Sequence, residues 1–101
     1  MSHVTNIMIS TVLDTKNLEE INKWIVKKEF ASFVEMDYDK HLGNKVFEPA
    51  VFYGAFNYFP INKFLDMLGK LNYEWAEMFQ IFIEDENDYC FKIYHASDLL
   101  L

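Results

Sequence analysis

The segment at residues 46–59 constrains the fold more than any other, because it alternates like a β-strand and is apolar on both sides. One side carries Val51, Tyr53, Ala55 and Phe59, and the other carries Phe52, Gly54, Phe56 and Tyr58. A strand that is apolar on both sides is typical of the middle of a sheet with both faces covered. Pro49 indicates an edge, a bulge or a later beginning of the strand. We therefore predict a sheet in which this segment is central.

Period-two spacing predicts four further strands. The first covers residues 5–13 and is again apolar on both sides, with Ile7 and Ile9 opposite Met8 and Val12. The others cover residues 30–38, 78–84 and 89–96, and the last two flank an acidic turn as a hairpin. We expect the core side of this hairpin to consist of Phe79, Ile81, Ile83, Phe91 and Ile93.

Two segments have the spacing of amphipathic helices. In residues 17–28, Leu18, Ile21 and Ile25 recur on one face, and Trp24 is expected to anchor that face in the core. Asn17 with a glutamate three residues later resembles a capping box. The second helix begins at Pro60, which suits a first turn, and is expected to end near residue 71.

The predicted order is β-α-β-β-α-β-β, with no linker or repeat, so residues 1–101 are expected to form a single α+β domain. Two β-α-β halves favour a ferredoxin-like two-layer sandwich. Its sheet is mainly antiparallel, with four or five strands, and both helices cover one face. The first and third strands are central in that arrangement, and they are the two that are apolar on both sides.

Two helices on one face leave the other face of the sheet without a cover. We expect it to carry part of an apolar set: Met8, Phe33, Val51, Tyr53, Ala55 and Phe59. A large apolar patch is rarely left open to water. A second copy of the chain, another protein, a ligand, or the chain's own carboxy-terminal hairpin and loops are the possible covers. A homodimer through this face is thus one expectation.

The charge balance bears on the partner. The chain has 9 basic and 16 acidic residues, a net charge of −7, and every basic residue is lysine. Without arginine or a basic surface, direct binding of nucleic acid is not expected. A basic protein partner is favoured, although acidity also serves solubility alone. No apolar stretch approaches the roughly 18 residues of a membrane span.

The chain has one cysteine, Cys90, so no disulfide can form inside the chain. We expect this small residue to be buried or half-buried. No signal peptide is recognisable at the amino terminus. These features predict a cytoplasmic protein that makes no contact with membranes.

Two groups of residues are candidates for partner or ligand contact. The densest acidic cluster is Glu84, Asp85, Glu86 and Asp88, which could dock a lysine- and arginine-rich partner, hold a cation, or be an ordinary solvated hairpin tip. Tyr53, Tyr58 and Trp75 form the second group, since exposed aromatic residues are enriched in binding surfaces.

A weaker candidate is a metal site at Asp37, Asp39 and His41, with Glu48 as a further ligand. The same residues also suit a solvated strand end. A calcium loop is disfavoured, because Leu42 stands where the sharp turn needs glycine. We predict no metal and no cofactor.

No convincing catalytic set is present. We therefore predict a small, acidic, non-enzymatic protein-binding module, such as an inhibitor, an immunity-type protein or a regulator, that docks on a basic partner. The alternative is a small homodimeric ligand-binding domain or enzyme with an aromatic cleft, for which Asp37, Asp39 and His41 are the first residues to inspect.

Overall fold

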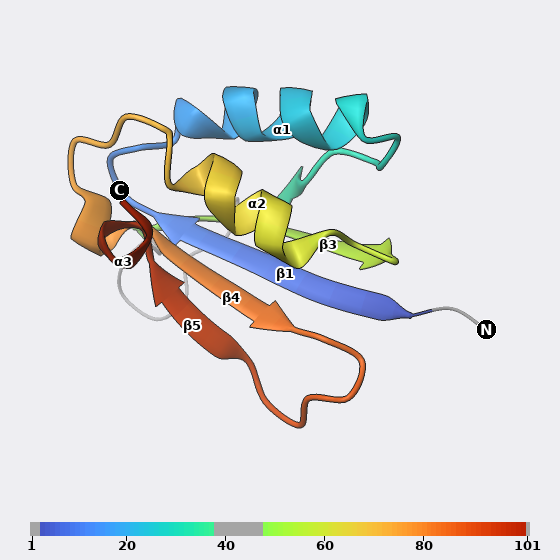
Figure 1. Cartoon of the computed structure of the whole chain (residues 1–101). Helices are drawn as coiled ribbons and strands as arrows, with labels where there is room; N and C mark the ends of the chain where they lie inside the picture. The colour runs from blue at the N-terminus through green and yellow to red at the C-terminus, as the bar shows by residue number, and fades with distance from the viewer. Residues whose placement is uncertain (1–2, 38–47, 101) are drawn as a thin grey trace.

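The computed structural model describes residues 3–37 and 48–100 (Figure 1). Within them the chain is α+β, as the sequence predicts, with a five-stranded antiparallel sheet and three α-helices, one more than the two that we predict. In chain order the elements are β1 (Val4–Thr11), α1 (Asn17–Lys27), β2 (Val34–Glu35), β3 (Ala50–Asn57), α2 (Ile61–Leu68), the short 3₁₀ helix η1 (Ala76–Met78), β4 (Gln80–Glu84), β5 (Lys92–His95) and α3 (Ala96–Leu99).

The strands lie in the order β2-β3-β1-β4-β5, and all neighbours are antiparallel. The longest pairing joins β1 to β3, from Val4 opposite Asn57 to Thr11 opposite Ala50. The first and third strands are therefore inside the sheet, which confirms their predicted position. The prediction of a late start for the third strand is also confirmed, since β3 begins directly after Pro49.

Helices α1 and α2 lie over the same face of the sheet (Figure 1). Alternate residues of β1 and β4 point into this layer, among them Ile7, Ile9 and Ile81, all at most 2% exposed. Phe64 of α2 is fully buried, and Phe59 lies 5.1 Å from it between ring centroids. Burial of such rings from water is the main force that holds the layers together.

The predicted strand at residues 30–38 is wrong over most of its described length, because only Val34 and Glu35 pair with β3. The preceding chain turns two aromatic rings into the core instead. Phe30 and Phe33 contact Phe56, with ring centroids 5.6 and 5.3 Å apart. Phe33 therefore belongs to the core and not to the open face.

Phe59 was also expected on the open face, and this is wrong. Tyr58 has a φ of 52°, in the left-handed region that a tyrosine rarely adopts. The alternation of β3 is broken there, and the next residue, Phe59, turns into the core, where it is 7% exposed.

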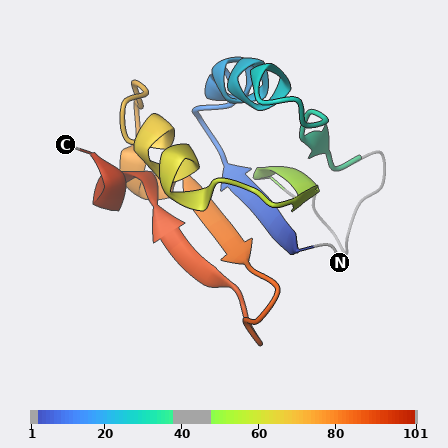
Figure 2. The same ribbon diagram turned by 45° about the vertical axis from the view of Figure 1, so that its right-hand side comes forward.

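The hairpin prediction needs a similar correction. Phe79, Ile81 and Ile83 are buried as predicted, but Ile93 pairs with Phe82 and therefore points to the opposite face. Ile93 and Phe91 are 56% and 41% exposed. The hairpin extends the sheet as β4 and β5 and does not fold over it (Figure 2).

The predicted capping box at the first helix is absent. Lys16 is the N-cap residue of α1, without a side-chain hydrogen bond, and Asn17 is the first helical residue. The amide group of Asn17 donates instead to the carbonyl of Asn72 at 2.8 Å. Asp14, 1% exposed, accepts the backbone N–H groups of Glu74 and Trp75 at 2.8 and 3.1 Å. Both side chains tie the β1–α1 turn to the segment after α2.

Helix α2 ends at Leu68, before the predicted residue 71, and Gly69 follows it. A side chain at Gly69 would collide with the backbone carbonyl of Leu99 in α3. Close approach of α3 to this backbone therefore requires a glycine here. Helix α3 packs against α2, η1 and β5, so the tail covers the end of the two layers.

Candidate functional site

The sheet face opposite α1 and α2 carries one apolar residue from each strand, aligned across the whole sheet. The register places Val34 opposite Tyr53, Tyr53 opposite Met8, Met8 opposite Phe82, and Phe82 opposite Ile93. We call these five residues the apolar row. Four spacings between strands of about 4.8 Å give the row a length of about 19 Å.

The apolar row is largely accessible to water. Val34, Tyr53 and Ile93 are 53%, 46% and 56% exposed, while Met8 and Phe82 are half-buried. Directly opposite residues on one face of an antiparallel pair have touching side chains. The row is thus a continuous apolar strip, and such strips mark interaction sites on soluble proteins. Tyr53, predicted as a contact residue, is at its centre.

A pocket of about 450 Å³ opens beside the row. Its wall includes Asn6 and Ala55, which form the next cross-strand pair, and it reaches Ser32 on one side and Phe91 on the other. Met8, Val34 and Tyr53 of the row also line it. Val51, predicted on this face, lies on it opposite Ser10, but it is only 6% exposed.

The four acidic residues Glu84, Asp85, Glu86 and Asp88, called here the acidic hairpin, are held by contacts within the chain. Asp85 accepts hydrogen bonds from the Thr5 hydroxyl at 2.7 Å and from His3 Nε2 at 2.8 Å. These bonds, first that of Thr5 and then that of His3, lower the pKa of the Asp85 carboxyl below its ordinary value.

His3 lies between two carboxylates. Its Nδ1 is 3.5 Å from a carboxylate oxygen of Glu86, and its Nε2 bonds to Asp85. The bond to Asp85 raises the pKa of His3 above its ordinary value, against the smaller opposing effect of desolvation. Because of these contacts, the acidic hairpin is fastened to the start of β1.

The other two carboxylates of the acidic hairpin have weaker ties. Glu84 accepts from the Asn6 amide at 3.3 Å, and Asp88 accepts the backbone N–H of Asp85 at 3.1 Å while lying 3.8 Å from Lys92. In the described part of the chain, no group of three or more histidine, cysteine, aspartate or glutamate side chains is arranged to hold a metal ion.

The structure separates the three aromatic contact candidates. Tyr58 is 68% exposed and stacks on His3, with ring centroids 6.3 Å apart, so it lies next to the acidic hairpin. Trp75 is 48% exposed, and its backbone N–H donates to Asp14, which lies just beyond the other end of β1. Seven residue steps separate the two ends of β1, about 23 Å. Trp75 therefore does not share a surface with Tyr58.

The weak metal candidates cannot be assembled from the described residues. Asp37 and Glu48 are exposed, and Asp39 and His41 lie outside the described ranges. Cys90 is exposed, contrary to the prediction, because β5 begins only at Lys92 and Cys90 falls in the hairpin loop. Trp24 packs on Phe59 and Phe64 in the core, as predicted.

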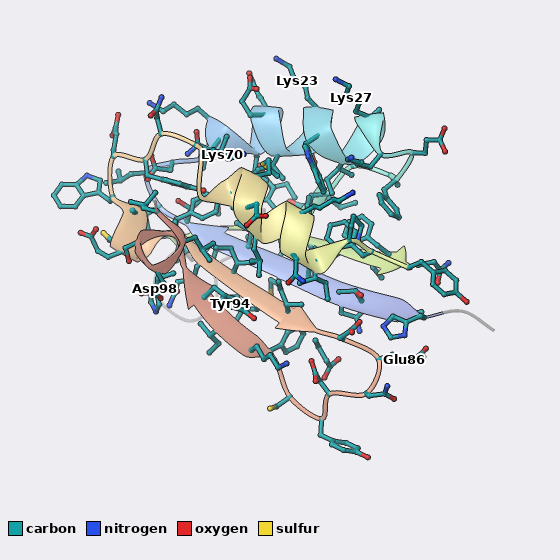
Figure 3. All side chains as sticks on the ribbon, viewed as in Figure 1. Lys23, Lys27, Lys70, Glu86, Tyr94 and Asp98 are labelled. Atoms are coloured by element: carbon teal, nitrogen blue, oxygen red, sulfur yellow. The ribbon has the colours of Figure 1, made fainter. Side chains whose placement is uncertain are left out.

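Charge is distributed unevenly between the two layers. Of the seven lysines that the structure describes, six lie in α1 or α2 or within two residues of them: Lys16, Lys23, Lys27, Lys28, Lys63 and Lys70. Figure 3 shows Lys23, Lys27 and Lys70 on the helix layer and Glu86 on the hairpin, away from them. Lys92 is the remaining one. Among the described residues, the acidic hairpin therefore borders the open face with Lys92 as the lysine beside it.

Comparison of the chain with protein-family models, with curated proteins and with solved structures found no match in any of the three. Across residues 3–37 and 48–100, no helix has the length and apolar character needed to cross a membrane.

Proposed function

We propose that this chain is a non-enzymatic protein-binding module that docks a basic protein against the open face of its sheet. The apolar row carries the proposal, since it places one apolar side chain from each strand of the sheet on a surface that no described helix covers. The proposed fold is a ferredoxin-like sandwich to which β5 adds an edge strand. The order β2-β3-β1-β4, with α1 and α2 on one face, supports it.

The shape of the surface favours a protein over a small molecule. A strip about 19 Å long across a sheet matches the scale of a protein interface, where each side buries about 800 Å². Such interfaces have an apolar centre and a polar rim. Here the centre is the apolar row, and Glu84 borders Phe82 on the same face of β4.

The charge of the rim favours a basic partner. The acidic hairpin stands at one end of the open face, and the lysines of the two helices lie on the opposite layer. Opposite charges around an apolar centre accelerate association and select the partner. The proposed setting is a reducing cytoplasm, since Cys90 is exposed and has no second cysteine with which to pair.

Substitutions of two equally exposed side chains test this function. Ile93 in the apolar row and Val26 on α1 are both 56% exposed. We expect columns carrying the wild-type protein or Val26→Glu to retain the same basic protein from a lysate, and a column carrying Ile93→Glu to lose it. The purified pair should then bind more weakly as salt rises.

Equal capture by the Ile93→Glu and Val26→Glu columns would refute the proposal. Sedimentation of the free protein gives a second test of the proposal. A dimer that Ile93→Glu converts to a monomer would show that a second copy, and not a basic partner, covers the face.

A further inference from the structure

We propose that the partner adds an extended strand to the outer edge of β3 at Ala55 and Asn57. This inference rests on the proposed protein-binding function and specifies how the partner is held. It depends on a separate observation, the backbone pairing at that edge, and not on the apolar row alone.

The register shows which backbone groups of β3 point away from β1. The N–H of Tyr58 donates to the His3 carbonyl at 2.8 Å, so Tyr58 points toward β1. Because backbone direction alternates along a strand, Asn57, Ala55, Tyr53 and Val51 point outward. The bond from Met36 N–H to the Val51 carbonyl, 2.8 Å long and on the outer side, agrees with this assignment.

Strand β2 covers only half of this outer edge. Its pairing joins Val34 to Tyr53 and Glu35 to Phe52, and it goes no further toward the end of β3. Within residues 3–37 and 48–100, no strand pairs with the outer side of Ala55 or Asn57. Both residues are exposed. Two N–H and two C=O groups are therefore available to an incoming strand.

The opposite edge of the sheet is less suitable. On β5 the N–H of Ala96 bonds to the Phe79 carbonyl at 2.8 Å, so by alternation Ile93 and His95 point outward. The N–H of His95 is already bonded to the Asp98 carboxylate at 3.2 Å. Helix α3 begins directly after it. Such local covers are how proteins protect their edge strands, and no residue of the described ranges forms a hydrogen bond of this kind to Ala55.

The surroundings of the free edge suit an extended peptide. The pocket of about 450 Å³ lies along it, lined by Ala55, Val34, Tyr53 and Ser32 among others. A peptide residue opposite Ala55 would place its side chain on the open face, inside this pocket, because directly opposite residues share a face. The small side chain of Ala55 leaves room for an apolar group there.

The next residue on the same face of the peptide would lie opposite Asn57. Asn57 pairs with Val4 on its other side, and the N–H of Val4 is 3.4 Å from a carboxylate oxygen of Glu86. A long basic side chain at this position would extend toward the acidic hairpin. In an antiparallel arrangement the partner motif is therefore Lys-x-Val or Lys-x-Ile, read from its amino end.

A synthetic peptide, acetyl-Thr-Thr-Lys-Thr-Val-Thr-Thr-amide, tests this directly on the full chain. In an NMR titration we expect the amide signals of Ala55 and Asn57 to move and their hydrogen exchange to slow. The same peptide with an N-methyl group on its valine lacks one donor, and it should bind about 10-fold more weakly, the effect of one hydrogen bond. Equal affinity of the two peptides, or changes confined to Ile93, would overturn the inference.

A protein variant separates this inference from the proposed function. Ala55→Pro removes an outward N–H, a change that edge strands tolerate, and Ala55→Ser is the control that keeps both this N–H and a small side chain. We expect Ala55→Pro to lose the peptide and the captured basic protein, and Ala55→Ser to keep both. Loss of the captured protein with Ile93→Glu but not with Ala55→Pro would overturn strand addition and leave the proposed function intact. Loss with neither would overturn both.

Discussion

His3 and Asp85, 82 residues apart in sequence, are joined by a hydrogen bond of 2.8 Å between Nε2 and Oδ1. The bond fastens the loop of the β4–β5 hairpin to the start of β1. Because both partners titrate, its contribution to stability depends on pH.

We expect the stability of the protein to fall as the pH rises above about 6.5. The pKa of His3 is raised in the folded protein. The stabilisation that His3 contributes is therefore complete below 6.5, the ordinary pKa of histidine, and is lost as the pH rises through the raised pKa of the folded state. The lowered pKa of Asp85 means that its contribution is present above 3.8 and is lost at lower pH. Urea unfolding at pH 5.5 and pH 8 should show the difference. His3→Gln should remove it, and an unchanged difference in that variant would exclude His3 as the cause.

Gly69→Ala should destabilise the protein by about 1–3 kcal/mol, the usual effect of overpacking. The added methyl group would meet the carbonyl of Leu99, which is backbone and can only yield if α3 moves. At an unobstructed helical position the same change stabilises by up to about 1 kcal/mol. Thermal unfolding shows whether Gly69→Ala stabilises or destabilises the protein. In a chain truncated after Asp98 the obstruction is gone, and there Gly69→Ala should no longer be harmful.

Asp14→Ala should cost about 2–4 kcal/mol, because two backbone N–H groups lose a charged acceptor. Asp14→Asn keeps one acceptor oxygen and should cost about half as much. Burial is the main cause of the raised pKa of Tyr73, and the charge of the Asp14 carboxylate is the second cause. Denaturant unfolding of both variants is the measurement, and equal costs would mean that the acceptor oxygen kept in Asp14→Asn does not contribute to stability.

Ile81→Ala and Ile93→Ala should differ sharply although both residues lie in the same hairpin. Ile81 is fully buried, and its truncation should cost about 2–5 kcal/mol. Ile93 belongs to the exposed apolar row, so its truncation should change stability by no more than about 0.5 kcal/mol. Unfolding free energies of the pair check the register, and similar losses would place Ile93 in the core.

Local patterns were sufficient to predict the two longer helices and the inner strands, but not the four-residue helix α3. The spacing of Leu18, Ile21 and Ile25 identifies the buried side of α1, and apolar residues on both sides of β1 and β3 identify them as inner strands. These features depend on neighbours within one element, which is why a single sequence contains them.

The apolar row and the free edge depend on long-range pairing, which the sequence pattern does not specify. The pattern of β5 allows Ile93 on either face, and only its pairing with Phe82 decides between them. Likewise the turn of Phe59 into the core follows from the left-handed backbone of Tyr58, a conformation for which tyrosine has no preference. The predicted contact residue Tyr53 was identifiable because it is aromatic, but its four neighbours in the row were not identifiable as a set.

A sheet with apolar residues on both faces has a weakness in its own assembly. Where one face is polar, a slip of β4 by one residue would bury the wrong side chains and is heavily penalised. In β4 such a slip would exchange Ile81 and Ile83 for Phe82, so the apolar residues oppose it only weakly. Most of the opposition comes from Gln80 and Glu84, which the slip would turn into the core. In the native alignment Asp85 also accepts a hydrogen bond from the Thr5 hydroxyl. This bond adds to the difference in stability between the two alignments, so Asp85→Ala should narrow that difference.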